Sequence, residues 1–351
     1  MKRIIKKNIL AAVAVVGIVG QAFAGNPQRA GSAGASELLI NPYARSSGWA
    51  DVSLGAVRGS NSFFVNIAGL SFIEKTDIRF ENTQWLVNTG IQINSLSFIQ
   101  RVSDNGVLGV AINGFDYGEW EVTTATQPDG TSGVIKPTAI VINIAYSQKF
   151  TESIYGGINI KAYNSSISNM KTTGLCFDAG VQYIPENNDA WKFGITLKNI
   201  GPALKYSGDG SSVILPVPTF GTSYTQAWDG KTATFELPTQ LAMGLSYDFT
   251  LAEDHRLTAA GAFTSNSFEK DFFQVGAEYS FKEVFMVRGG YKIYNQGGDD
   301  LRPALTGLTA GFTAQLPLSK ENKGSFLGLD YSYRATNPFQ GVHSVGIMVG
   351  F

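Results

Sequence analysis

The chain of 351 residues carries few charged residues and many glycine and aromatic residues. Charged residues make up 16% of it, against about 25% in ordinary soluble domains, aromatic residues make up 12%, and the formal net charge is −1. This near-neutral balance gives no electrostatic basis for binding nucleic acid. The mean hydropathy of +0.01 and the absence of a long apolar run after the N-terminal stretch argue against helical membrane spans. The same composition is typical of a transmembrane β-barrel.

Residues 1–24 have the features of a secretory signal peptide. Basic residues near the start precede a short apolar run, which ends in small residues at Ala22 and Ala24. We expect cleavage after Ala24 and export of the remaining chain. The single cysteine, Cys176, cannot form an internal disulfide, so the exported protein must be stabilised in another way.

Residues 25–75 form a separate predicted segment. They are too irregular for a membrane-spanning strand, but they contain enough apolar residues to be ordered. The predicted organisation is therefore a signal peptide at 1–24, an ordered N-terminal segment at 25–75 and an outer-membrane β-barrel at 76–351.

From residue 76 onward, apolar and polar residues alternate with the period of a β-strand. In the stretch AIVINIAYSQ, Ile140, Ile142 and Ile144 fall on one face, whereas Asn143 and Ala145 fall on the other. An aliphatic face that ends in aromatic residues suits a lipid-facing wall with an aromatic girdle. The pattern predicts fourteen strands, at 76–86, 91–102, 106–117, 137–149, 154–164, 174–184, 191–199, 238–249, 256–265, 272–281, 285–294, 304–315, 325–334 and 342–351.

The connections between these strands support an even-stranded barrel with both ends on the periplasmic side. Short polar connections are predicted at the inner end, and long connections at the outer end. The predicted inner turns are 103–106, 150–153, 185–190, 251–255, 282–284 and 319–324, and the long outer loops are 118–136, 165–173, 200–237 and 295–303.

The outer loop at 200–237 is unusually apolar for a segment outside the membrane. It contains Leu215, Val217, Phe220, Tyr224 and Trp228. Exposed apolar residues often mark a binding surface, and aromatic residues are favoured anchors at interfaces. Two interpretations stay open: the loop binds cargo or a partner protein, or it folds onto the barrel mouth and buries these residues itself.

The chain ends on an aromatic residue within a predicted strand. Ser344, Gly346, Val349 and Phe351 match the C-terminal recognition signal of outer-membrane barrels, in which a polar residue, a glycine and hydrophobic residues recur at fixed positions. Because the last strand of a closed barrel must pair with the first, its end cannot fray without opening an edge in lipid. We therefore expect this tail to close the barrel and to act as its assembly signal.

The N-terminal segment resembles the signature of the PorV/PorQ family of outer-membrane proteins. That signature joins a Pro-x-Ala-Arg stretch to an Asn-Pro-Ala-x-Leu stretch, and Pro42, Arg45, Asn66 and Leu70 match it here, while Ile67 replaces its second proline. The resemblance implies an all-β fold of the FadL type: an antiparallel transmembrane barrel of about fourteen strands, with the N-terminal segment inside as a plug or hatch.

The resemblance also implies a function in type IX secretion. Such a barrel is not the conduit. It binds the conserved C-terminal domain of secreted cargo proteins at the large translocon barrel and delivers them to a cell-surface sortase or attachment complex. The implied partners are these proteins and outer-membrane lipid, with no nucleic acid. An alternative from the same fold is a FadL-like transporter of hydrophobic small molecules, and a third is a general porin, against which the ordered segment 25–75 argues.

Catalytic and cofactor chemistry are not expected. The two histidines, His255 and His343, are too few for a metal cluster, and His343 points away from its neighbour Ser344 because adjacent strand residues face opposite sides. Asp299 and Asp300 are expected to be a solvated loop rather than a metal site. The charged residues of the lumen face could line a passage, but we expect them to form an ion-pair network in which Arg45 pairs with carboxylates. They are Asp178, Lys198, Asp248, Glu278, Arg288, Lys292, Asp330 and Arg334.

Overall fold

The computed structural model describes residues 27–29, 31–130, 133–219, 222–294, 304–318 and 325–351. The predicted signal peptide, Phe220, and the pair Asp299 and Asp300 lie outside these residues. Among the helices of the described residues, none is long and apolar enough to cross a membrane.

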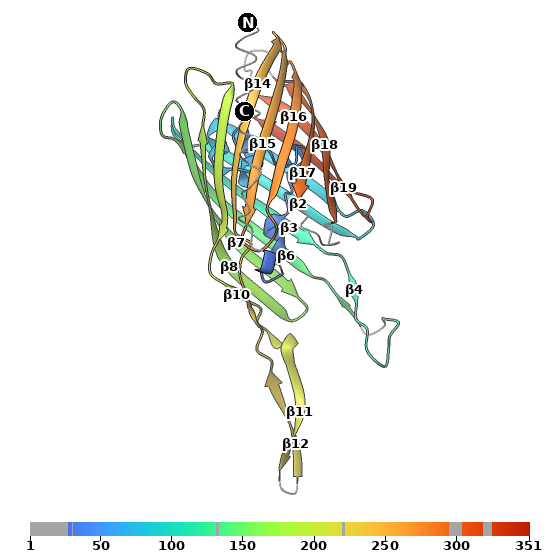
Figure 1. The fold of residues 1–351 in the computed structure, drawn as a ribbon. Coiled ribbons are helices and arrows are strands. Elements are labelled where there is room, and N and C mark those ends of the chain that lie inside the picture. Colours follow the sequence, from blue (N-terminus) through green and yellow to red (C-terminus); the bar gives the residue numbers. More distant parts are fainter. Residues whose placement is uncertain (1–26, 30, 131–132, 220–221, 295–303, 319–324) are drawn as a thin grey trace.

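Fourteen antiparallel strands form a closed barrel in which the last strand pairs with the first (Figure 1). Each predicted strand is present, and the boundaries differ by at most four residues. The strands are β1 (Thr76–Trp85), β2 (Ile91–Arg101), β3 (Gly106–Asp116), β6 (Thr138–Lys149), β7 (Ile154–Ile167), β8 (Met170–Tyr183), β9 (Trp191–Ile200), β14 (Gln240–Ala252), β15 (His255–Asn266), β16 (Phe272–Phe281), β17 (Phe285–Tyr294), β18 (Leu305–Pro317), β19 (Phe326–Thr336) and β20 (Val342–Gly350).

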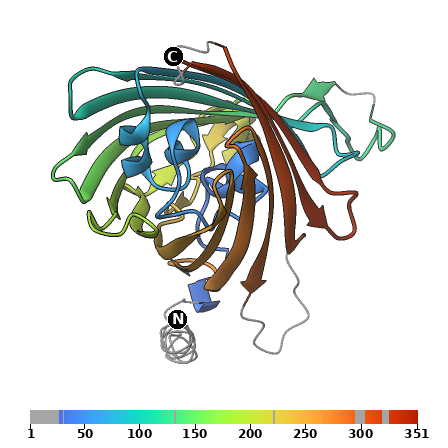
Figure 2. The same cartoon turned by 90° about the horizontal axis from the view of Figure 1, so that it is seen from above.

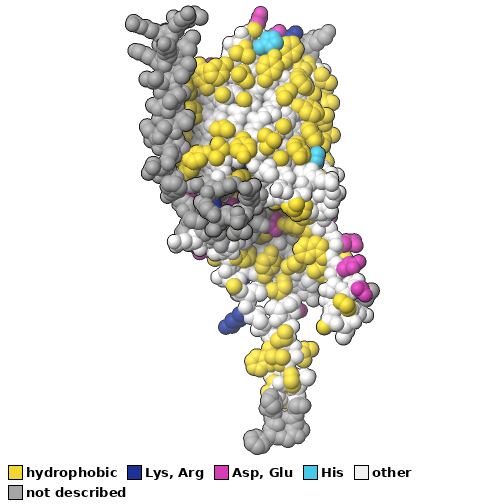
Figure 3. Space-filling model, turned by 45° about the vertical axis from the view of Figure 1, so that its right-hand side comes forward, with side chains coloured by type: hydrophobic (Ala, Val, Ile, Leu, Met, Phe, Trp, Pro, Cys, Tyr) yellow, Lys and Arg dark blue, Asp and Glu magenta, His cyan; other side chains and the backbone are white. Residues whose placement is uncertain are grey.

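The alternation along each strand separates a lipid-facing wall from a lumen-facing wall. On β6, Ile140, Ile142 and Ile144 are exposed on the outside, whereas Asn143 and Ala145 are about 1% exposed on the inside. Many hydrophobic side chains lie on the face of the outer wall seen in Figure 3. Apolar side chains face outward and polar side chains face inward, the reverse of a soluble domain, because the lipid around the outer wall is apolar and the enclosed space is polar.

The two rims of the barrel differ in the length of the connections that they carry. Thr76 and Phe351 exchange two backbone hydrogen bonds, of 3.1 and 2.9 Å, at the rim that carries the short turns, here called the inner rim. The opposite, outer rim carries the longer connections. One connection differs from its prediction: the expected loop 165–173 is a tight turn, because β7 and β8 continue to Ile167 and from Met170 and pair there.

The long connection between β9 and β14 forms secondary structure of its own. It contains β10 (Leu204–Lys205), which pairs with β13 (Thr234–Phe235), a short η6 (Asp209–Ser211), and the hairpin of β11 (Ser212–Thr219) and β12 (Thr222–Asp229). The β11–β12 hairpin projects beyond the outer rim (Figure 1). A smaller pair, β4 (Trp120–Glu121) and β5 (Val134–Ile135), lies in the connection between β3 and β6.

The N-terminal segment lies inside the ring of strands (Figure 2). It contains four 3-10 helices and one α-helical turn: η2 (Pro27–Arg29), η3 (Ser36–Leu39), α2 (Ala44–Ser47), η4 (Gly59–Phe63) and η5 (Ile67–Phe72). Its apolar residues supply most of two buried clusters, one around Phe63, Ile67 and Leu70 and one around Trp49, Val52 and Leu54. The barrel therefore folds around its own N-terminal chain.

Candidate functional site

The inner wall of the barrel holds the N-terminal segment through hydrogen bonds to its backbone. Gln182 on β8 donates to the carbonyl oxygens of Leu54 and Val57, at 3.0 and 3.2 Å. Farther around the wall, Gln274 on β16, four strands from β8, donates to the carbonyl of Ala50 at 2.8 Å. Irregular backbone is stable at membrane depth only where protein satisfies its polar groups, and polar lumen residues do so here.

At the outer rim, the segment begins beside the long connection. The Arg29 guanidinium lies 2.6 Å from the Glu236 carboxylate, and Glu37 accepts hydrogen bonds from the hydroxyls of Tyr117 and Tyr163, at 2.6 and 3.0 Å. The segment then crosses the lumen and joins β1 at the inner rim. It therefore spans the lumen between the two rims.

The residues that match the sequence signature lie within this buried segment. The Pro42 carbonyl accepts a hydrogen bond of 3.3 Å from Thr83, and Leu70 is 0% exposed beside Phe63. Asn66 is the most connected of the set: its amide donates to the carbonyls of Leu54 and Val181 at 3.0 Å, and its side-chain oxygen caps η5 by accepting from the Ala68 N–H. These positions thus join the segment to itself and to the wall.

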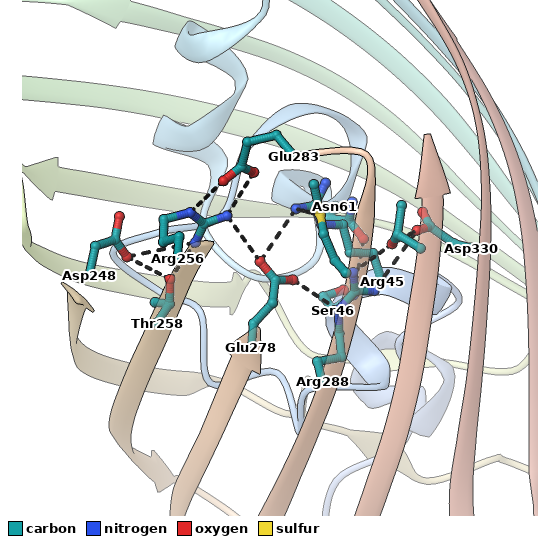
Figure 4. A network of polar contacts seen from close by, with 12 residues as sticks. Arg45, Ser46, Asn61, Asp248, Arg256, Thr258, Glu278, Glu283, Arg288 and Asp330 are labelled. Carbon is teal, nitrogen blue, oxygen red and sulfur yellow. Dashed lines mark hydrogen bonds and ion pairs between the residues drawn. The ribbon is translucent and has the colours of Figure 1, made fainter. Parts of the chain in front are cut away.

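Arg45 lies in the lumen at the edge of a network of ion pairs (Figure 4). Its Nη2 is 3.6 Å from Glu278 and 3.1 Å from the sulfur of Met286, so the expected pairing with a lumen carboxylate is present. Glu278 is also 2.9 Å from Arg288 and 3.5 Å from Arg256. One carboxylate on β16 therefore faces three guanidinium groups from three parts of the chain.

The network continues around the wall on both sides of Glu278. Arg79 lies 2.5 Å from Asp330 and 3.2 Å from Glu81, while Arg256 is 2.7 Å from Glu283. Arg79 and Glu81 were not predicted as members, although both alternate with the lipid-facing residues Ile78 and Phe80 and could have been found by that signal. Buried charges are stable only when paired and hydrogen-bonded, and this pairing favours a structural network over the lining of a passage.

Asp51 and Glu283, outside the strands, show the electrostatic effect of these pairs. Burial alone would raise the pKa of Asp51, but Lys292, 2.6 Å away, and the amide of Asn41 hold the pKa of that carboxyl below its ordinary value. The two hydrogen bonds from Arg256 likewise hold the pKa of Glu283 below its ordinary value, against the opposite effect of burial. Both carboxylates are therefore ionised at neutral pH.

A cavity of about 450 Å³ lies between the network and the N-terminal segment near the inner rim. We call this space the vestibule. Its lining includes side chains of both charges, with some apolar contacts from Trp49, Val57, Ile184 and Met286. The charged lining residues are Arg45, Arg58, Asp189, Lys192, Asp248, Arg256, Glu278 and Glu283. A second, smaller cavity of about 40 Å³ lies beside Lys198 and Lys292.

The second candidate site is the β11–β12 hairpin. In its register Leu215 pairs with Gln226 and Val217 with Tyr224, while Trp228 pairs with Val213, so these side chains share one face. We call this face the apolar hairpin face. Leu215, Tyr224 and Trp228 are 48%, 53% and 52% exposed. The alternative that the loop folds onto the barrel mouth and buries these residues is therefore wrong for the described part of the hairpin.

The C-terminal tail forms the last strand. Ser344 is buried and accepts a hydrogen bond of 2.7 Å from Thr83, while Val349 pairs with Ile78 across the closing seam. Gly346 faces the lumen, where a side chain would overlap the carboxylate of Glu81. Phe351 is 46% exposed at the inner rim. Packing against Glu81 therefore requires a residue without a side chain at position 346.

The histidines form hydrogen bonds to tyrosines on the outer wall. The Nδ1 of His255 lies 2.6 Å from the hydroxyl of Tyr279, and the Nδ1 of His343 lies 2.8 Å from that of Tyr331. His255 begins β15, instead of lying in the predicted inner turn, because the strand extends to it. Within the described residues, no group of three or more His, Cys, Asp or Glu side chains is arranged to hold a metal ion.

Comparison with known proteins gives a family and a fold. A family model described as "Type IX secretion system protein PorV" matches residues 23–225, more than half of the chain. No curated protein matches the sequence.

Several solved structures share the fold at low sequence identity. The Pseudomonas putida toluene transporter TodX is 13% identical, with a TM-score of 0.54 over 88% of this chain and 97% of that chain. The CymD monoaromatic hydrocarbon channel is 13% identical, with a TM-score of 0.54 over 89% and 97%. A Pseudomonas aeruginosa FadL homologue is 10% identical, with a TM-score of 0.51 over 87% and 98%. At these identities the likeness shows a FadL-type barrel fold and nothing of the ligand.

Proposed function

The chain belongs to the PorV family of type IX secretion system proteins, and from this premise we propose that it is an accessory barrel that binds secreted cargo at the translocon. It recognises the conserved C-terminal domain of the cargo and delivers the protein to the cell-surface sortase or attachment complex. The barrels of this family and of the FadL type are secretion and transport proteins of the outer membrane, not enzymes.

The observation that carries the proposal is the apolar hairpin face. It lies beyond the outer rim, where neither the lumen nor the membrane wall covers it (Figure 3). When a partner covers apolar side chains that are about half exposed, the removal of their surface from water makes binding more favourable. The tryptophan and the tyrosine of this face are residue types that dominate binding energy at protein interfaces. We therefore place the contact with cargo or translocon on this face.

The lumen supports an accessory role over that of a conduit. The N-terminal segment spans the lumen and is hydrogen-bonded to separate strands of the wall, β8 and β16. We propose that residues 25–75 act as the plug of the barrel at 76–351. A FadL-like transporter of hydrophobic molecules would be favoured by an apolar cavity behind the plug, whereas the vestibule is lined by charged side chains.

Affinity purification from cross-linked outer membranes tests the proposal. The tagged protein is compared with the variants Trp228→Ser and Tyr224→Ser, and every captured protein is identified by mass spectrometry. Ile214→Ser is the matched control, because Ile214 is 73% exposed on the opposite face of the same hairpin. We expect the wild type and the control to capture the translocon barrel and secreted proteins that share a C-terminal domain, and the two test variants to lose them.

Two results would contradict the proposal. Capture by Trp228→Ser and Tyr224→Ser equal to that of the wild type would remove the partner contact from the apolar hairpin face. A wild-type barrel that purifies alone, carrying a fatty acid or another apolar molecule, would replace the secretion role with that of a FadL-like transporter.

The two ends of the chain carry further proposals. We propose that residues 1–24 are removed on export, and N-terminal sequencing of the mature protein should begin at Gly25. We also propose that Ser344, Gly346, Val349 and Phe351 form the assembly signal. Phe351→Ser should lower the fraction of folded barrel in outer membranes, while Phe281→Ser, a lipid-facing control of similar exposure, should not. Equal folded fractions would count against the signal.

A further inference from the structure

We propose that the vestibule is a binding site for a phosphate group, held by Arg45 and Arg58 of the N-terminal segment. The site is separate from the apolar hairpin face, and its occupancy does not depend on the proposed secretion role. The group can belong to a free phosphate ester or to a phospholipid headgroup, because both present the same oxygen atoms.

The position of the vestibule makes it accessible to a molecule from the inner side. Its walls include Ile184 and Asp189 from the turn between β8 and β9, and Glu283 from the turn between β16 and β17. Both turns lie at the inner rim, together with the C-terminus. The cavity of about 450 Å³ is within the usual size range of small-molecule sites, about 300–1,000 Å³.

Arg58 is a cation whose donors are not used. In the described part of the chain, its guanidinium has no hydrogen bond and no ion pair, and its central carbon lies 4.9 Å from the centre of the Phe72 ring. Arg58 is exposed to the vestibule. A guanidinium offers five N–H donors in a planar fork that matches phosphate oxygens. Its full hydrogen-bonding capacity is thus available to a ligand.

Arg45 and Asn61 also line the vestibule and carry further N–H donors. Arg45 uses one nitrogen, Nη2, for its long contact with Glu278 and its contact with the Met286 sulfur. The side chain of Asn61 is 1% exposed, and its Nδ2 has no hydrogen-bond partner among the described residues. Both residues lie beside the ion-pair network in Figure 4. A buried amide donor without an acceptor is rare, and a ligand oxygen would satisfy it.

The carboxylates around the vestibule are occupied by other cations. Glu283 lies 2.7 Å from Arg256, Asp248 forms a short contact with Lys192, and Glu278 is 2.9 Å from Arg288. Asp189 is exposed at the inner rim. Glu283, Asp248 and Glu278 are therefore each paired with a cation other than Arg45 and Arg58. A ligand at Arg45 would compete with its 3.6 Å contact to Glu278 and its contact with the Met286 sulfur.

The electrostatic environment of Arg58 agrees with this assignment. The loss of surrounding water inside the barrel lowers the pKa of Arg58. The charges of Arg256 and Arg45 lower this pKa further, whereas those of Asp248 and Glu283 raise it. Added negative charge would relieve this repulsion. A phosphate monoester, with a charge of about −1.5 to −2 at pH 7, has several acceptor oxygens for the guanidinium groups that line the vestibule, which favours it over a chloride ion.

Isothermal titration calorimetry on the purified full-length barrel in detergent, in buffer without phosphate, tests the site. The probes are inorganic phosphate, glycerol 3-phosphate and dihexanoyl phosphatidic acid, with dihexanoyl phosphatidylcholine and sodium chloride as comparisons. Arg58→Gln is the main variant, because it removes no hydrogen bond or ion pair among the described residues and should fold. Arg58→Lys keeps the charge without the fork, and Lys136→Gln removes an exposed cation near the outer rim.

We expect at least one phosphate probe to bind the wild type and Lys136→Gln equally, and Arg58→Gln about tenfold or more weakly, since charged hydrogen bonds are lost. Arg58→Lys should give an intermediate affinity. Tighter binding of phosphatidic acid than of glycerol 3-phosphate identifies a lipid headgroup, whereas equal binding identifies a free phosphate ester. The proposal is overturned if no phosphate probe binds the wild type, or if Arg58→Gln binds as the wild type does.

Discussion

The lumen buries charged residues, whereas the β11–β12 hairpin exposes apolar ones. In the lumen, charged residues such as Arg79 and Asp330 are at most 3% exposed and paired within the wall. In the hairpin, Tyr224 and Trp228 are about half exposed beyond the membrane wall. Much of the lumen charge is satisfied within the chain, because residues such as Arg79, Glu278 and Asp330 form ion pairs with one another or with neighbouring strands. The hairpin leaves an apolar surface that the chain itself does not cover.

This difference separates residues that stabilise the barrel from residues that act on other molecules. A buried ion pair contributes little over an apolar pair, but removal of one partner is costly because the other charge remains buried. An exposed aromatic side chain contributes little to folding and much to association. Substitutions in the two regions should therefore affect different measurements.

The largest expected effect comes from breaking the ion-pair network at Arg79. Arg79→Ala leaves Asp330 and Glu81 buried without their common cation, and we expect a loss of about 3–5 kcal/mol in the free energy of unfolding. Urea unfolding in phospholipid vesicles, followed by tryptophan fluorescence, measures this loss. Lys136→Ala, which removes an exposed cation, is the control. Equal midpoints for the two variants would show that the network does not stabilise the barrel.

A smaller effect is expected where the N-terminal segment joins the wall. Asn66→Ala removes the donor to Leu54 and Val181 and the cap of η5, and should cost about 1–3 kcal/mol. Hydrogen exchange should increase at residues 53–70 more than in the barrel strands. Asn82→Ala, which removes an exposed hydrogen bond to Asn94, is the matched control. Unchanged exchange in Asn66→Ala would mean that other contacts suffice to hold the segment.

The smallest effect on stability is expected in the hairpin. Trp228→Ser and Tyr224→Ser should change the free energy of unfolding by less than about 0.5 kcal/mol, because neither side chain is buried. Phe63→Ala, at a side chain 3% exposed in the segment, should cost about 3–5 kcal/mol under the same conditions. Strong destabilisation by the hairpin variants would show that the hairpin packs against the barrel and would weaken its assignment as a free binding surface.

The strands were predictable because a lipid-facing wall imposes one residue type at every second position. That rule placed β16 and β17 at their observed boundaries, and it put Glu278 and Arg288 on the lumen face. The rule does not determine where a strand ends beyond the membrane, since both faces are then polar. For this reason β7 and β8 continue through residues that the sequence assigned to a loop.

The candidate sites were predictable only in part. The sequence signalled the apolar residues of the outer loop, but two arrangements were compatible with them, and the strand register decided that Leu215, Val217, Tyr224 and Trp228 share an exposed face. The role of Arg58 had no signal in the sequence. Its unused donors follow from the carboxylates around it pairing with other cations, and such pairing depends on distances between strands.

The sequence by itself determined the class of fold, the number and order of the strands and the closure of the last strand on the first, because alternation and connection length are local properties. Tertiary structure decided which lumen charges pair, how the N-terminal segment crosses the barrel, and which polar donors face an open cavity. These features depend on residues far apart in the chain, such as Arg45 and Glu278, and a local pattern does not contain the distance between them.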